Sequence, residues 1–444
     1  MNEMKQPFSS AGHSFPGKMR FQDFAGRSIY SVFFLKTVAL SVFLCLISLI
    51  AAPDDCHAEA ASTAVVGFLT PKTVDGLDEK SIITGFELFF REKSLNPSAY
   101  MLQQKYGPTE ESLLESFADL LKRPDVKFVV APMDIKSAER IVEASAASNV
   151  IIFVPHGSVR FVSGELCSPN IFRLRPNTYV SSQPLAKWAF LNLGPKVFIV
   201  NDEGLEANEQ ADFFALGMER IGGSFGDRIK ISRGSEDYDA VFDKIKDVRP
   251  DFVFAALSRK NSPGFLKAFR DNSAVANIPL IGVESLTSYP EPIKSLGKEG
   301  LGIRTLTSML NPVEFEKSLA GKSGRSLNLE MVAQGYDIAS VLYSCIQKGL
   351  FAEGASEKPA EYISKLTIDG PRGKIQFDAN REAIVPMAVG HWVTDPNGGI
   401  KRVVDADLDQ CRSIDFGCGG VGFPDRPEQA PVDSNQGLWE EHQQ

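Results

Sequence analysis

The sequence predicts an α/β fold in which parallel sheets form two lobes. Short apolar runs without polar alternation recur along the chain, at 64–69, 126–131, 150–154, 196–200, 251–257 and 278–283. Segments with apolar residues at helical spacing alternate with them, at 81–93, 136–148, 209–221, 239–248 and 263–272. Continuous apolar strands separated by helices indicate parallel sheets covered on both faces. The alternation pauses near 173–176 and restarts with a helix at Ser181, which predicts a crossing between two lobes.

The C-terminal part of the chain has a different organisation. A long helix is expected at 331–348, followed by a strand at 374–378 whose residues alternate between apolar and polar. Residues 388–393 and 400–404, joined through the turn-forming residues 395–399, predict a hairpin. From residue 411 to 444 the composition turns to Gly, Pro, Asp, Gln and Glu, so we expect a largely disordered tail.

The N-terminal 60 residues are predicted to be a secretory signal peptide. Basic residues precede an apolar run at 37–52, and the small-residue site Ala58-Glu59-Ala60 follows. The alternative is a membrane anchor, but the run is shorter than the ~20 residues of a spanning helix. We therefore expect cleavage after Ala60 and a periplasmic protein. Neither Cys45 nor Cys56 has the small residues expected before a lipidated cysteine.

Composition and cysteine content limit the function classes. The formal charge is −9, and the basic residues are scattered, which argues against nucleic acid or anionic lipid as a partner. After processing, Cys167, Cys345, Cys411 and Cys418 remain, and four cysteines allow three pairings. A local bridge between Cys411 and Cys418 is the first choice, and Cys345 is expected to be a buried thiol. The string GCGGVG at 417–422 matches a dinucleotide fingerprint, but Pro424 follows where a helix would be required.

An exported enzyme is disfavoured. Only His156 and His391 lie in the expected folded body. The chain has no H-E-x-x-H, G-x-S-x-G or phosphate-loop motif, and no cysteine pair has zinc-site spacing. We expect no catalytic residue, no metal and no cofactor.

Several local strings, in this order and spacing, resemble the type I periplasmic binding proteins of the branched-chain amino acid (leucine/isoleucine/valine) ABC transporter family. They are GFLTP at 67–71, SNVIIFVPHGS at 148–158, PNIFRLRP at 169–176, DYDAVFDKIKDVRPDFVFAAL at 237–257, AQGYDIASVLY at 333–343 and DGPRGKIQFDANRE at 369–382. The resemblance implies two Rossmann-like lobes joined by three crossings, with a ligand cleft between them. Lobe one would comprise 61–177 plus 305–366, and lobe two 178–304 plus 367–410. A monomer that delivers its ligand to an inner-membrane ABC permease is implied.

Lobe one offers candidate ligand contacts in two loops at the carboxyl ends of strands, where parallel sheets bind ligands. Ser137 matches a serine that the family uses at a helix start, and its alternative role is a helix-cap hydroxyl. The resemblance implies that the backbone and hydroxyl of Ser158, after Gly157, hold a ligand carboxylate. His156 replaces a small residue of the family and is either a contact or a solvated or capping side chain.

In lobe two, Glu284 falls where the family places an acid against the ligand ammonium group. Elsewhere the chain departs from the family. Asp78, Glu206 and Ser258 occupy positions that are commonly tyrosine, and Thr178 stands where an Asp is common. A cleft without aromatic walls favours a polar amino acid, an amide or another small acid over leucine. A sensor of the same fold that reports to a receptor is the alternative to transport.

Overall fold

The computed structural model describes residues 64–408 except 73–76, 133, 163–165, 167, 233, 289–292 and 320–326. The expected signal peptide, the tail, the glycine-rich string at 417–422 and the pairing of Cys167, Cys411 and Cys418 lie outside the described residues. Cys345 is buried and has a free thiol, as expected, and burial raises its pKa to about 12. Among the helices of the described ranges, none combines the length and apolarity needed to span a membrane.

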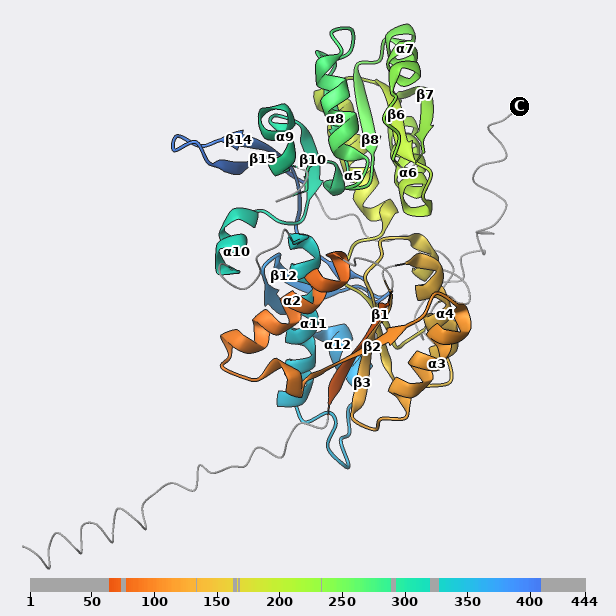
Figure 1. Cartoon of the computed structure of the whole chain (residues 1–444), viewed down its shortest axis with the longest axis vertical. Helices are drawn as coiled ribbons and strands as arrows, with labels where there is room; N and C mark the ends of the chain where they lie inside the picture. Colours follow the sequence, from red (N-terminus) through yellow and green to blue (C-terminus); the bar gives the residue numbers. More distant parts are fainter. Residues whose placement is uncertain are drawn as a thin grey trace, which may run out of the picture. The chain divides into compact units, whose positions relative to one another are not determined.

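The first sheet is parallel, with strand order β2-β1-β3-β4-β5. Its strands β1, β2 and β3 are labelled in Figure 1. Successive side chains of a strand point to opposite faces, so both faces of this sheet need a cover. Along β1, Val66 and Phe68 pack with α2 and α11, whereas Leu69 packs with α3 and α4. The elements are β1 (Val65–Pro71), α2 (Leu77–Glu92), β2 (Met101–Tyr106), α3 (Glu110–Leu121), β3 (Val126–Val130), α4 (Ile135–Ser145), β4 (Ile151–Val154), β5 (Ile171–Arg173) and α11 (Leu329–Gln347).

The second sheet has the order β15-β14-β10-β9-β8-β6-β7 and is parallel except at β14 and β15. Helices again cover both faces: Phe214 of α6 stacks on Phe254 of β8, and Phe265 of α8 packs with Val253 on the opposite face. The elements are α5 (Thr178–Asn192), β6 (Lys196–Asp202), α6 (Leu205–Arg220), β7 (Ser224–Ile231), α7 (Asp239–Val248), β8 (Phe252–Ala256), α8 (Ser262–Asp271), β9 (Leu280–Gly282), β10 (Arg304–Thr307), β14 (Met387–Thr394) and β15 (Ile400–Leu408). The predicted α/β class with parallel sheets in two lobes is confirmed.

A third, small sheet contains β11, β12 and β13. It packs on α11 and α12, and Glu382 beside β13 forms a bridge to Arg173 of β5, so it belongs with the first sheet. Two boundaries of the expected division therefore move. Strand β10 pairs in the second sheet, and β11 to β13 pack with the first, so we propose that lobe one comprises 64–177 plus 309–384 and lobe two 178–308 plus 385–408. The remaining elements are α9 (Ile293–Leu296), α10 (Pro312–Ser318), α12 (Pro359–Lys365), β11 (Ile368–Gly370), β12 (Gly373–Phe377), β13 (Ala383–Ile384) and the 3-10 turns η1 (Pro97–Ala99), η2 (Val159–Val162), η4 (Glu284–Thr287) and η5 (Gly297–Gly300).

Helices α2 and α11 approach each other at two glycines. A Cβ atom at Gly85 would lie 1.7 Å from the carbonyl oxygen of Val332, and one at Gly335 would lie 1.8 Å from that of Ile82. Because these obstacles are backbone atoms of packed helices, no side-chain rotation can relieve them. We expect Gly335→Ala to destabilise the protein by about 1–3 kcal/mol, the cost of overpacking a dense core. Urea unfolding would measure this, with Gly204→Ala, which meets nothing within 4 Å, as the control. An unfolding free energy equal to the wild type would contradict it.

Candidate functional site

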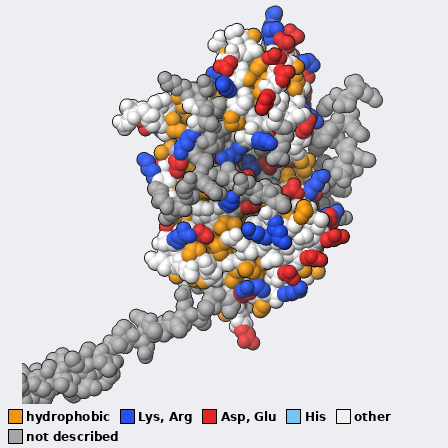
Figure 2. Space-filling model, viewed as in Figure 1, with side chains coloured by type: hydrophobic (Ala, Val, Ile, Leu, Met, Phe, Trp, Pro, Cys, Tyr) orange, Lys and Arg blue, Asp and Glu red, His pale blue; other side chains and the backbone are white. Residues whose placement is uncertain are grey.

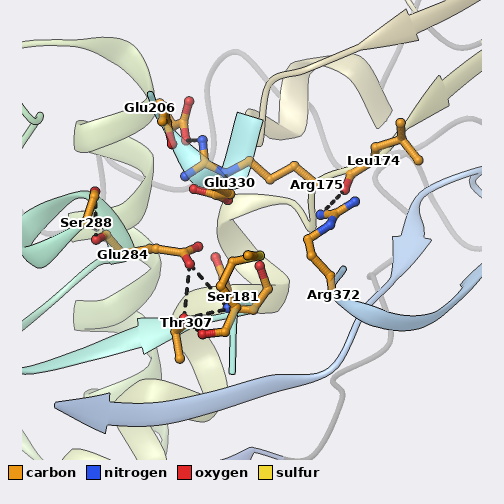
Figure 3. A network of polar contacts seen from close by, with 12 residues as sticks. Leu174, Arg175, Ser181, Glu206, Glu284, Ser288, Thr307, Glu330 and Arg372 are labelled. Carbon is orange, nitrogen blue, oxygen red and sulfur yellow. Dashed lines mark hydrogen bonds and ion pairs between the residues drawn. The ribbon is translucent and has the colours of Figure 1, made fainter. Parts of the chain in front are cut away.

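Buried charge pairs tie the first crossing, at 173–177, to the segment that leads into the third crossing, at 384–385. Arg173 lies 3.1 Å from Glu382, and the same carboxylate accepts hydrogen bonds from the backbone and side chain of Asn177 at 2.9 and 3.0 Å. Arg372 pairs with Asp337 at 2.6 Å and also donates to the carbonyl oxygen of Leu174 (Figure 3). Both pairs are almost completely buried. These contacts hold in place the segment 173–177, from which Arg175 projects into the site.

The hydroxyl group of Ser158 donates to a side chain that was not predicted. Glu209, in the second turn of α6, accepts hydrogen bonds from Ser158 Oγ at 2.8 Å, Thr178 Oγ1 at 2.9 Å and the backbone N–H of Val159 at 3.2 Å. Burial raises the pKa of Glu209 to about 7, against the opposite effect of these three donors. Two residues expected to bind a ligand, Ser158 and Thr178, are thus brought together around a carboxylate of the protein itself.

His156 and Gly157 shape the same loop. His156 is buried; its Nε2 lies 3.1 Å from the carbonyl oxygen of Pro132, and its ring stacks on Phe161. Burial lowers the pKa of His156, so the ring is neutral at pH 7 and supplies no cation. Gly157 accepts a hydrogen bond from the Thr178 backbone at 2.7 Å, and a Cβ atom there would lie 3.1 Å from the carbonyl oxygen of Pro176. The absence of a side chain lets the first crossing lie against this loop.

Ser137 lies in the first turn of α4. The N-cap of this helix is Asp134, whose side chain accepts a hydrogen bond from the Ser137 N–H at 2.9 Å. The Ser137 side chain also hydrogen-bonds to Tyr106, which partly offsets the rise that burial causes in the tyrosine pKa. The structure therefore gives Ser137 partners within lobe one, and its role toward a ligand stays a prediction.

Arg175 is the centre of an ionic cluster that joins both lobes. It follows the first crossing strand and lies 2.7 Å from Glu206 of α6 and 3.4 Å from Glu330 of α11 (Figure 3). Burial alone would lower the pKa of Arg175, but the negative charges of Glu206 and Glu330 raise it. The guanidinium is therefore always charged, and its two partners come from different lobes. Neither Arg175 nor Glu330 was among the predicted site residues.

Glu284 begins the 3-10 turn η4, two residues after β9, and lies opposite this cluster. It accepts hydrogen bonds from Thr307 Oγ1 at 3.1 Å and from the Ser308 N–H at 3.4 Å (Figure 3). Burial, and then the neighbouring Glu330, raise the pKa of Glu284 to about 8, although Arg402 and Arg175 act in the opposite direction. In turn, burial lowers the pKa of Arg402, whose guanidinium lies 4.5 Å from the Trp392 ring, to about 10. A neutral Glu284 is therefore favoured until a further positive charge arrives.

Two adjoining cavities lie among these side chains. A small inner cavity of about 30 Å³, large enough for one water-sized group, is lined by Glu206, Glu284, Glu330, Arg175, Thr178 and Ser181. A larger one of about 540 Å³ shares Arg175, Glu206 and Glu330 with it, and adds Asp78, Asp202 and Ser258. Ser258 donates its N–H to Asp202 at 2.7 Å, and Asp78 accepts from Asn328 at 2.8 Å. The polar residues expected in place of tyrosines do line the cavity.

Carboxylates outnumber cations around these two cavities. The acids are Asp78, Asp202, Glu203, Glu206, Glu284 and Glu330, and the bases are Arg175, Arg259 and Lys260. Arg402 lines a third, smaller cavity beside Glu284 and Glu330. On the rest of the molecular face in Figure 2, acidic and basic side chains are interspersed, with no large patch of one sign. Within the described ranges, no group of three or more His, Cys, Asp or Glu side chains has the arrangement of a metal site. The site is thus suited to bind a small polar molecule through ionic contacts.

A family model described as periplasmic binding protein matches residues 107–399. This chain belongs to the periplasmic binding protein family. The match spans elements of both lobes, including Ser158, Thr178 and Glu284. A comparison with curated proteins gives no match.

Solved structures with the same fold include ABC transporter substrate-binding proteins. One from Sphaerobacter thermophilus is 17% identical, with a TM-score of 0.70, and covers 78% of this chain and 98% of its own. A solute-binding protein from R. palustris in complex with benzoate is 18% identical (TM-score 0.65; 79% and 99% covered). A leucine-binding protein from Thermotoga maritima is 18% identical (TM-score 0.62; 78% and 99% covered). At these sequence identities, the similarity shows that this periplasmic binding protein shares the fold of those proteins.

Proposed function

We propose that this periplasmic binding protein is the solute-binding component of an ABC-type importer. Its ligand would be an amino acid or a related small polar compound that carries a cationic nitrogen, enclosed by hinge closure of the two lobes. The observation that carries the proposal is Glu284, whose buried carboxyl group lines a water-sized cavity together with Glu206 and Glu330. A buried carboxylate needs a cationic partner, and an ammonium group has the size of this cavity.

The cellular setting is proposed from the family and the chain's N-terminus. A periplasmic binding protein made with a cleavable signal peptide would be released into the periplasm, and its partner would be an inner-membrane permease. A ligand that touches both lobes favours the closed form, which is the form that a permease would recognise. We propose that it acts as a monomer, as a binder and not as an enzyme. A sensor would share the same cleft and differ only in its partner surface.

A ligand screen tests the proposal directly. The purified mature protein would be screened by thermal shift against amino acids, amines, amides and aromatic acids, and each hit measured by calorimetry. We expect selective stabilisation by amine-bearing compounds, because only these supply the charge that Glu284 needs. Stabilisation by benzoates alone, which solved structures of this fold bind, would contradict the proposed ligand class.

The affinity for a cationic ligand should depend on pH. The pKa of Glu284 is about 8 without ligand, and a cation beside it lowers that pKa. Below pH 8, binding therefore releases a proton, so the affinity should rise from pH 6 to 8, by at most about tenfold per pH unit, and level off above. Calorimetry at pH 6.5 in buffers of different ionisation enthalpy would count the released protons. An affinity that does not change between pH 6 and 8 would contradict a cation at Glu284.

A further inference from the structure

We propose that Glu209 permanently fills the carboxylate seat of the cleft, so that the ligand is an amine or guanidinium compound without a carboxylate beside its cationic group. This inference rests on the proposed function, which supplies the cationic group, and narrows it to one chemical class. The carboxylate seat is defined as the hydroxyl groups of Ser158 and Thr178 together with the backbone N–H of Val159.

The geometry of the seat is that of an anion site. Three donors from two segments converge on one carboxylate, at 2.8, 2.9 and 3.2 Å. Both hydroxyl side chains are buried, with Ser158 0% and Thr178 1% exposed. A built set of buried donors of this kind requires an acceptor, because unpaired buried polar groups are unfavourable. Glu209 supplies both oxygens, one to Ser158 and the other to Thr178 and Val159.

The seat reaches the inner cavity through Thr178, whereas Ser158, Val159 and Glu209 lie behind its lining. Thr178 lines the inner cavity with Glu284 and Glu330, and so do Glu206 and Gln210, which flank Glu209 along α6. A ligand whose ammonium group lies at Glu284 would therefore bring an adjacent carboxylate close to this seat. Since Glu209 already occupies it, that carboxylate would have to displace a side chain of the protein or remain among other acids.

The charge balance of the cavities points the same way. Six acids and three bases line the two cavities, so the formal charge is 3 − 6 = −3 before Glu209 is counted, and −2 when Glu284 is neutral. Arg175 already binds Glu206 and Glu330. Arg402 has buried nitrogens that make no hydrogen bond in the described part of the chain, but it faces Glu284 and Glu330. A cation gains from this surrounding field, whereas a second carboxylate is repelled by it.

The hydrogen bond between Ser158 and Glu209 also connects the two lobes without a ligand carboxylate. Ser158 belongs to the first lobe and Glu209 to α6 of the second, 51 residues along the chain. A ligand carboxylate is not needed to make this contact. Here the protein supplies it, and the ligand needs to provide only the cationic end and whatever fills the larger cavity of about 540 Å³.

Matched ligand pairs test the inference on the unmodified protein. Calorimetry at pH 7.5 would compare lysine with cadaverine, arginine with agmatine, and leucine with isopentylamine, since each pair differs only in the carboxylate. We expect at least one amine to bind, and its amino acid to bind at least tenfold more weakly. An amino acid that binds as tightly as its amine would overturn the inference but not the proposed function. If an amino acid binds and its amine does not, the inference fails and the proposed function stands, whereas both fail if no amine-bearing compound binds.

Two variants of Glu209 separate occupancy of the seat from other causes. Glu209→Ala empties the seat, so acetate should raise the melting temperature of this variant. The affinity for the amino acid should also rise at least tenfold relative to the affinity for its amine. Glu209→Gln keeps the seat filled, so neither change is expected, and Glu219→Ala, an exposed acid on the same helix, serves as the control. A folded Glu209→Ala protein that ignores acetate and keeps the wild-type preference would overturn the inference. If Glu209→Ala does not fold, the ligand pairs decide alone.

Discussion

Glu284→Gln should weaken the binding of a cationic ligand by about a hundredfold or more and leave the ligand-free protein at least as stable as the wild type. The loss follows from removing the charge partner of a buried cation, which costs about 3–5 kcal/mol, and each 1.4 kcal/mol corresponds to about tenfold in affinity. The stability follows from the opposite situation in the empty site. There the carboxyl group of Glu284 is desolvated and lies beside Glu330, which raises its pKa.

The two effects have opposite signs, which makes the experiment discriminating. Because the pKa of Glu284 rises from 4.5 to about 8 on folding, the folded protein loses stability relative to the unfolded chain as pH rises through that window. Glutamine carries no charge, can still accept the hydrogen bond from Thr307, and removes this contribution. Calorimetry with the best amine of the ligand screen and thermal unfolding at pH 7.5 would measure both quantities, with Glu219→Gln as the control. Unchanged affinity would remove Glu284 from the binding site.

The sequence predicts the fold well where strands are covered on both faces. Buried strands such as β3, β4 and β8 appear as continuous apolar runs and were anticipated within a few residues. The strands β2 and β7 were missed. They lie at the edges of the two parallel arrays, beyond β1 and β6, so one flank is open and polar residues are tolerated. An alternating or polar edge strand has no apolar run by which to recognise it.

Only those residues of the candidate site could be predicted that follow from their position in a loop or from the resemblance to the family. Thr178, Ser258 and Glu284 do line the cavities, because residues at the carboxyl ends of parallel strands and at the following crossing converge there. The partners of these residues come from distant parts of the sequence. Glu209 meets Ser158 across 51 residues, and Glu330 approaches Arg175 from α11, which follows the second crossing at 308–309. Nothing in the local spacing of either acid distinguishes it from a solvated helical glutamate.

Glu382→Ala should strongly destabilise the protein. The carboxylate of Glu382 is 2% exposed and binds Arg173 of the first crossing strand and Asn177 at the start of α5. Removing it leaves the Arg173 guanidinium buried without its counter-charge, which costs about 3–5 kcal/mol. Urea unfolding would measure the change, and Asp119→Ala, which breaks an exposed ion pair with Lys122, should leave the midpoint nearly unchanged.

A double substitution distinguishes the ion pair from simple packing. Arg173→Met with Glu382→Leu replaces both charges by apolar side chains, so no charge remains buried and unpaired, and the loss should be much smaller than for Glu382→Ala alone. Asn177 would still lose its acceptor, and the carbonyl oxygen of Phe161, which accepts from Arg173 at 2.7 Å, would lose its donor, so some destabilisation should persist. If the double variant is as unstable as the sum of its single substitutions, the two side chains act independently. The ion pair would then not be what ties the third crossing to the first.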